Sequence, residues 1–167
     1  GKTATPQLAE VVENVVFNPT WTVPQSIVVG EGLGAALLAN PKRAVRENYK
    51  VTKFENGWVS VVQQPGDGNS LGRMKIDMPN PHAIYLHDTP AQGMFGLSGR
   101  NLSHGCIRVE RPLELATLLL DTSSRAALHE ALDTLEERRL SVEPIVPTHI
   151  LYLTAWADEA GVLHFAP

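Results

Sequence analysis

With 167 residues, the chain is long enough to bury the core of one domain, and its 43% hydrophobic and 19% charged residues are ordinary for a globular protein. A formal net charge of −4 argues against the clustered basic surface that binds nucleic acid, and no apolar run approaches the ~20 residues of a membrane-spanning helix. Because the sequence begins at Gly1 and shows no signal peptide, we interpret it as a trimmed chain without its targeting segments.

The first half of the chain predicts short elements separated by turns. Its opening is apolar and β-prone, and prolines then interrupt regular structure. The Asn56-Gly57 pair is a strong hairpin signal. The elements expected here are a strand at 11–17, a break at 18–24, short helices at 24–27 and 33–38, and a hairpin of 49–54 with 58–63.

The second half predicts further strands, a glycine-rich loop and then helices. Pro112 fits the first turn of a helix, and Leu128, Ala131 and Leu135 lie on one apolar helical stripe. The elements expected here are strands at 71–77 and 83–87, a loop at 89–102, helices at 112–120 and 124–140, and a buried strand at 150–157 paired with 162–165. The predicted fold class is therefore mostly β with a few helices, an α+β fold, in a single domain over 1–167.

Cys106 is the only cysteine of the chain, and its neighbours indicate a reactive thiol. His104, Gly105 and Arg108 flank it, and His87 lies nineteen positions upstream. A free cysteine has a pKa of about 8.5, so a neutral histidine must take its proton before it attacks a carbonyl carbon at neutral pH. The segment therefore predicts a cysteine acyltransferase with one nucleophile and two candidate bases.

The residues around the cysteine fit supporting roles. Gly105 leaves room for a substrate and frees backbone N–H groups to face an oxyanion. Arg108 can present a forked cation to a substrate carboxylate, and Ser103 can hydrogen-bond a histidine and fix its tautomer.

Each of these residues also has a structural interpretation. A lone cysteine is more often a buried packing residue, His87 could be a core histidine, and Arg108 could be a surface cation. His104 and Cys106, joined by His87 or His82, could also ligate zinc. A four-ligand zinc site needs a further donor, and none stands out in the sequence.

The pattern resembles a known family. His87, fifteen intervening residues and then Ser103-His104-Gly105-Cys106-Ile107-Arg108 are similar to the signature of the L,D-transpeptidases of the YkuD type. Further blocks at 18–24, 65–72 and 151–156 resemble the larger proteobacterial branch of that family. The resemblance covers essentially the whole chain from Thr3 onward.

This resemblance implies a reaction on peptidoglycan stem peptides without a cofactor or metal. Cys106 would attack the peptide bond before the terminal D-alanine of a tetrapeptide donor, and the acyl group would pass to an amine of a second stem. His87 matches the family's base, which a neighbouring backbone carbonyl holds, here that of Asp88. The other matching residues are Ser103 and His104 in support, the amides of Gly105 and Cys106 as an oxyanion hole, Arg108 in donor binding, and Tyr85, Trp21 and Asn101, with Met94 and Phe95, in the cleft walls.

The resemblance also implies a β-sandwich fold, a lid, a location and a pharmacology. The strand hairpin with which family domains usually begin, ahead of the point that matches Gly1, is absent from this sequence. The segment at about 30–48 matches a lid and is short, with glycines that suggest mobility. Acylation by carbapenems and a periplasmic or otherwise extracytoplasmic location follow from the family and its substrate.

Two other functions remain open from the sequence. An L,D-carboxypeptidase or amidase would share the first half-reaction and give the acyl group to water. A non-catalytic peptidoglycan-binding module would carry Cys106 as a vestige, and the intact pair of His87 and Cys106 argues against it.

Overall fold

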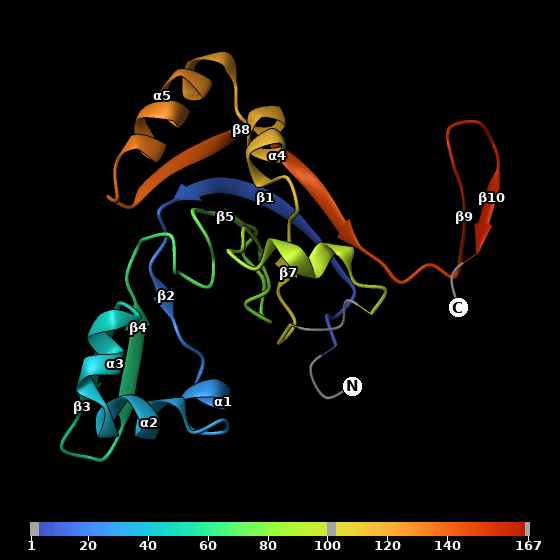
Figure 1. Ribbon diagram of the computed structural model, residues 1–167. Helices are drawn as coiled ribbons and strands as arrows, with labels where there is room; N and C mark the ends of the chain where they lie inside the picture. Colours follow the sequence, from blue (N-terminus) through green and yellow to red (C-terminus); the bar gives the residue numbers. More distant parts are fainter. Residues whose placement is uncertain (1–3, 100–102, 166–167) are drawn as a thin grey trace.

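A five-stranded sheet forms the body of the protein in the computed structural model, which describes residues 4–99 and 103–165 (Figure 1). Its strand order is β7-β6-β5-β1-β8, and all neighbours are antiparallel except the parallel pair β6 and β7. The strands are β1 (Leu8–Phe17), β5 (Met74–Asp77), β6 (Leu86–His87), β7 (Ile107–Arg108) and β8 (Arg138–Ile150). His87 and the segment that begins next to Cys106 thus lie at one edge of this sheet.

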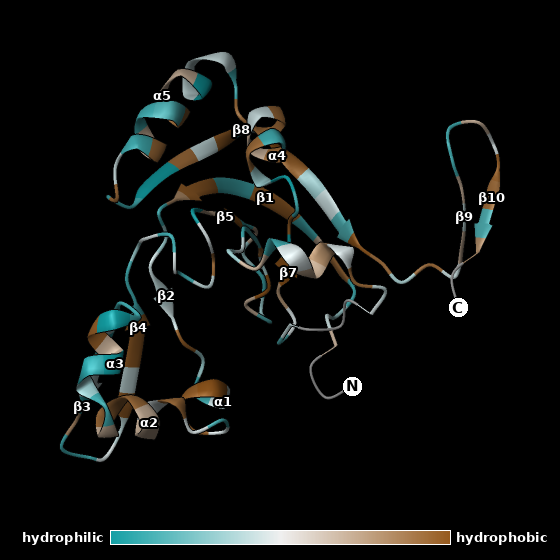
Figure 2. Cartoon of the chain, in the orientation of Figure 1, coloured by the Kyte–Doolittle hydropathy of each residue, from teal (hydrophilic) through white to brown (hydrophobic). Residues whose placement is uncertain are grey.

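Two helices cover the sheet and close the main hydrophobic core. They are α4 (Pro112–Leu119) and α5 (Thr122–Asp133). Apolar and polar stretches follow one another along strand β1 (Figure 2). Its side chains Val12, Val15 and Phe17 are buried in the main core. Ala116 of α4 and Leu128 of α5 belong to the same cluster, so the strand and the helices share one core.

Residues 21–63 form a separate unit, which we call the cap. It contains β2 (Trp21–Thr22), α1 (Gln25–Val28), α2 (Leu33–Ala39), α3 (Pro41–Arg46), β3 (Tyr49–Lys53) and β4 (Val59–Gln63). Its sheet has the order β2-β4-β3, and the three helices lie beside it (Figure 1). Val28, Leu37 and Val61 belong to a hydrophobic cluster distinct from that of the body, so the cap has its own core.

A buried polar junction fixes the cap to the body. Asn69 is 1% exposed, and its Nδ2 donates to the carbonyl of Pro19 at 3.0 Å, which ties together the two segments that enter and leave the cap. Asn18 is fully buried at a φ of 48°, and its Nδ2 donates to the carbonyl of Ala131 at 2.7 Å. Arg73 Nε donates to Asn18 Oδ1 at 2.7 Å. The blocks 18–24 and 65–72 singled out by the resemblance therefore build this junction.

The structure confirms the α+β class and most of the early elements, with small shifts. The strand at 11–17 lies within β1, the helix at 33–38 within α2, and the 49–54/58–63 hairpin matches β3 and β4. Strand 71–77 starts later, at Met74, because the chain still turns at Gly72, whose φ is +62°. The break at 18–24 contains the short strand β2, the loop at 89–102 contains the 3-10 helix η1 (Gln92–Gly96), and helix α3 was not expected.

Two predictions near the C-terminus are wrong. The helix expected at 124–140 ends at Asp133, because the chain enters β8 at Arg138. The strand expected at 150–157 is not buried: β8 ends at Ile150, and β9 (Ala155–Ala157) is exposed throughout. The pairing itself is confirmed, since β9 and β10 (Leu163–Phe165) form a hairpin that stands away from the body (Figure 1).

Long apolar helices are not found in the described part of the chain. None of the helices within 4–99 and 103–165 is long and apolar enough to cross a membrane.

Candidate active site at the β6–β7 edge

Parallel pairing of β6 and β7 brings the two halves of the sequence motif together. His87 lies opposite Arg108, and the amide of Val109 donates to the carbonyl of His87 at 2.8 Å. The amide of Ile107 donates to the carbonyl of Tyr85 at 3.1 Å. Cys106 therefore lies beside Tyr85 and near His87, although it comes nineteen positions after the histidine in the sequence.

The thiol of Cys106 is half-buried and faces the segment that precedes β6. Its Sγ lies 3.8 Å from the carbonyl oxygen of Ala83, to which it donates. Burial, and then the negative charge that Cys106 carries as a thiolate, raise the pKa of Tyr85 well above its ordinary value of 10.0. The phenol therefore keeps its proton at neutral pH and is available as a donor to the sulfur.

Tyr85 is itself held from three sides. The side chain of Trp21 in the cap hydrogen-bonds it, Lys75 Nζ lies 4.5 Å from its ring centroid, and the ring of His87 meets it edge-on at 5.9 Å. Tyr85 and Trp21, expected as cleft walls, therefore form a connected pair beside the cysteine.

His87 is buried in the orientation that a general base needs. It is 5% exposed, and its Nδ1 lies 2.5 Å from the carbonyl oxygen of Asp88. Because a carbonyl only accepts, Nδ1 carries the proton and Nε2 is left with its lone pair. Burial lowers the pKa of His87 below its ordinary 6.5, and the Asp88 carbonyl opposes this in part. The ring is thus neutral at neutral pH.

The carboxylate of Asp88 is held by backbone rather than by the histidine ring. Oδ2 accepts from the amide of Arg73 at 2.9 Å, and Oδ1 accepts from the amide of Thr89 at 2.7 Å. A side chain on Gly72 would overlap this carboxylate, so only glycine fits there. Gly72 and Arg73 thereby set the position of Asp88, whose carbonyl orients His87, as the resemblance implies.

The loop before the cysteine is tight and internally bonded. Gly105 has a φ of +114°, which favours glycine, and its amide donates to Ser103 Oγ at 3.2 Å. The hydroxyl of Thr5 donates to the Gly105 carbonyl at 2.8 Å. His104 Nε2 lies 2.5 Å from Glu31 Oε1, across the gap to the cap. The serine expected to bond a histidine thus bonds the Gly105 amide.

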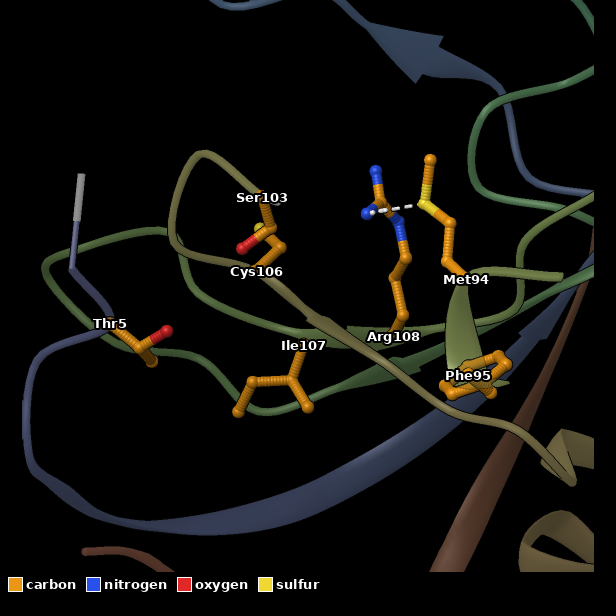
Figure 3. Close-up of a pocket in the computed structure, with 7 residues that line it drawn as sticks. All are labelled: Thr5, Met94, Phe95, Ser103, Cys106, Ile107 and Arg108. Atoms are coloured by element: carbon orange, nitrogen blue, oxygen red, sulfur yellow. Dashed lines mark hydrogen bonds between the residues drawn. The ribbon is translucent and has the colours of Figure 1, made fainter. Parts of the chain in front are cut away.

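Two cavities meet at the cysteine. Cys106, Ser103 and Arg108 line both of them. The larger, of about 760 Å³, lies between cap and body and is also lined by Trp21, Tyr85, His87 and His104. The smaller, of about 290 Å³, is closed by Thr5, Met94, Phe95 and Ile107, with Arg108 Nη1 3.3 Å from Met94 Sδ (Figure 3). The thiol is therefore open to ligands from two directions.

The structure assembles most residues that the sequence predicts for the site. Asn101 lies outside the described residues. Thr5 and Glu31 were missed because each reaches the site only through the folding of a distant segment, and no local pattern marks them. Within residues 4–99 and 103–165, no group of three or more His, Cys, Asp or Glu side chains converges as a metal site.

We expect the imidazole of His87 to titrate below pH 6.5 in the folded protein. Burial is the main cause, and the charge of Arg108 also lowers this pKa, so Arg108→Gln should move the midpoint to higher pH. NMR titration of the ring protons in a Cys106→Ala background measures it, with His87→Gln as the assignment. Arg111→Gln removes an exposed cation three positions after Arg108 and should leave the His87 midpoint unchanged.

The same pKa shift links His87 to stability. Because the folded state favours the neutral ring, its contribution to stability is present above pH 6.5 and is lost as the pH falls through the folded-state pKa. A His87 midpoint at or above pH 6.5 in the Cys106→Ala protein with Arg108 intact would contradict the burial argument.

Comparisons with known proteins agree with this geometry. The family model for the YkuD L,D-transpeptidase catalytic domain matches residues 1–129. A Haemophilus influenzae protein named "Putative L,D-transpeptidase" is 30% identical over 178 aligned positions, which cover 96% of this chain and 36% of the relative. The chain thus spans about a third of that relative's length. The helices and strands of this chain are consistent with a YkuD-like β-sandwich domain. The chain therefore belongs to the L,D-transpeptidase family.

Proposed function

We propose that this chain cross-links peptidoglycan stem peptides through an acyl-enzyme on Cys106, with release of D-alanine from a tetrapeptide donor. The observation that carries the proposal is the position of the thiol, between two cavities and beside a buried histidine held as a neutral base. A transferase needs room for two substrates at one nucleophile, and the two cavities supply it. Because stem peptides lie outside the cytoplasm, the proposal includes an extracytoplasmic location.

The first half-reaction uses His87 as base and then as acid. The Cys106 proton passes to His87 Nε2, and the thiolate attacks the carbonyl carbon that precedes the terminal D-alanine. The amides of Gly105 and Cys106 donate hydrogen bonds to the resulting oxyanion. To do so, the Gly105 amide gives up its hydrogen bond to Ser103 Oγ. The C–N bond breaks, His87 returns the proton to the leaving amine, and a thioester remains on Cys106.

Residues around the thiol would orient the donor and stabilise the charged states. Arg108 reaches both cavities and can pair with a carboxylate of the stem. The Tyr85 hydroxyl, supported by Trp21, can donate to the thiolate before it attacks. In the second half-reaction an amine of another stem attacks the thioester and passes a proton to neutral His87, the thiolate leaves, and an amide bond joins the two stems.

Intact mass spectrometry tests this proposal directly. Incubation with a disaccharide-tetrapeptide should add the acyl mass to the wild type, release D-alanine and produce cross-linked dimers, whereas Cys106→Ala should show none of these. Tripeptide monomers without dimers would identify an L,D-carboxypeptidase instead. A carbapenem should also acylate Cys106, because its strained lactam carbonyl presents the same electrophile. Absence of every adduct would reject the acyl-enzyme.

A further inference from the structure

Glu31 is a carboxylate placed at the candidate active site by the cap. Among the described residues that line the two cavities, it is the only Asp or Glu, whereas Arg43, Arg108 and three histidines supply cationic or neutral groups. The cavity that contains Glu31 also contains Cys106, so a ligand in that space meets one anionic side chain on its way to the thiol.

The backbone of the cap fixes the position of this carboxylate. Glu31 follows α1, and its amide donates to the carbonyl of Ile27 at 3.2 Å. The next amide, of Gly32, donates to the carbonyl of Val29 at 3.2 Å. A side chain at Gly30 would overlap the carbonyl of Ser26, so the turn is tight. Glu31 therefore projects from a closed turn.

His104 connects Glu31 to the catalytic loop. Its Nε2 lies 2.5 Å from Glu31 Oε1, and His104 is two residues before Cys106. About half of each side chain is exposed, at 49% for His104 and 54% for Glu31. A contact this exposed contributes little to folding. Both side chains also line the larger cavity, so a ligand in that space can reach them.

We propose that Glu31, together with His104, recognises the cationic amino group of the acceptor and takes the proton that it must lose before it attacks. This inference rests on the proposed function and names the chemistry of the second substrate: a stem-peptide amine, bound as its ammonium. Water carries no such charge, so Glu31 favours transfer over hydrolysis.

Residues of the site can accept both protons that the acceptor ammonium loses. The ammonium gives one proton to His104, whose cationic form Glu31 stabilises, and this proton passes on to solvent. The free amine attacks the thioester carbon, and its second proton passes to neutral His87. The C–S bond then breaks, which leaves an amide and the Cys106 thiolate beside protonated His87, ready for the next donor.

Glu31→Gln tests the inference, because it removes the charge while keeping the shape. Acylation of Cys106 by the tetrapeptide donor should stay within about twofold of the wild type. The ratio of dimers to hydrolysed monomers at a fixed acceptor concentration should fall about tenfold, below the full contribution of a general base because the pair is half-exposed. The acceptor KM of the wild type should rise with salt, and that of the variant should not.

Glu55→Gln is the matched control. Glu55 is an exposed carboxylate in the same cap, in the β3–β4 turn and away from both cavities, so its loss should change neither acylation nor the dimer ratio. An unchanged dimer ratio in Glu31→Gln would overturn the inference and leave the proposed function standing. Loss of acylation together with transfer in Glu31→Gln would also overturn it, because Glu31 would then support the thiol. No acylation in the wild type would instead reject the proposed function.

Discussion

Replacement of His87 by glutamine should lower the rate of Cys106 acylation at pH 7 by on the order of 10³-fold, within the range measured for general bases. The buried, neutral ring has its lone pair on Nε2, so it can take the thiol proton at neutral pH. Glutamine fills much of the same space and cannot accept that proton. The rate of mass gain with the tetrapeptide donor or with a carbapenem measures the effect.

The pH dependence should change in form as well as in size. Without the histidine, the thiol proton can only be lost to solvent, so the rate should keep rising with pH where the wild-type rate levels off because His87 is already neutral. His82→Gln is the matched control, because His82 lines the same cavity and is exposed. If His87→Gln kept the wild-type rate and profile, the base would have to be another group.

Gly72→Ala should nearly abolish activity although the residue lies outside both cavities. The new methyl group would meet Asp88, whose Cβ would lie 2.6 Å away, and would push the carboxylate off the amide of Arg73. The Asp88 carbonyl would then move and release His87. A misplacement of about 1 Å costs on the order of 10²-fold in rate, which sets the expected loss.

Gly57→Ala separates this effect from backbone strain. Gly57 has a φ of +82°, similar to the +62° of Gly72, but nothing lies within 4 Å of an added Cβ. Gly57→Ala should lose about 1–2 kcal/mol of unfolding free energy from the left-handed backbone, measured by urea denaturation, and Gly72→Ala should lose more, because the overlap with Asp88 adds to that loss. Only Gly72→Ala should also lose activity. Equal activities in two folded variants would show that Asp88 does not position His87.

Local sequence patterns predicted those helices and strands whose formation depends on neighbouring residues in the sequence. The Asn56-Gly57 turn defines its hairpin by itself, and the apolar stripe of α5 brings Leu128 and Ala131 into the core. The stripe did not indicate where the helix ends, and Leu135, expected on it, is 58% exposed. The end depends on the long-range pairing of β1 with β8, which no window of the sequence contains.

Strand β8 shows why such an element escapes a sequence pattern. Pro144 and Pro147 argue against a strand, since proline cannot donate to a sheet ladder. In the structure β8 is an edge strand, and its register with β1 shifts between Val12 and Asn14, opposite the segment that contains Pro144. An edge and an irregular register both tolerate proline, but neither is visible before the sheet has formed.

The candidate site also contains residues that the sequence predicts and residues that only the folded structure reveals. Cys106, its neighbours and His87 follow a sequence signature, because the reaction dictates residue types and the β6–β7 pair dictates their spacing. The supports of these residues do not follow from it. Gly72, which makes room for Asp88, and Glu31, which reaches His104 from the cap, depend on contacts between segments far apart in the chain.

The buried junction at Asn69 has a consequence for how this protein can change. Since Asn69 Nδ2 bonds the carbonyl of Pro19, the chain leaves the body and returns to it at neighbouring points, and the cap between them folds around its own core. A segment inserted between adjacent ends can lengthen, shorten or be exchanged without straining its host. Evolution, or a protein engineer, can therefore graft a different cap onto the body and leave the segments that carry Cys106 and His87 untouched.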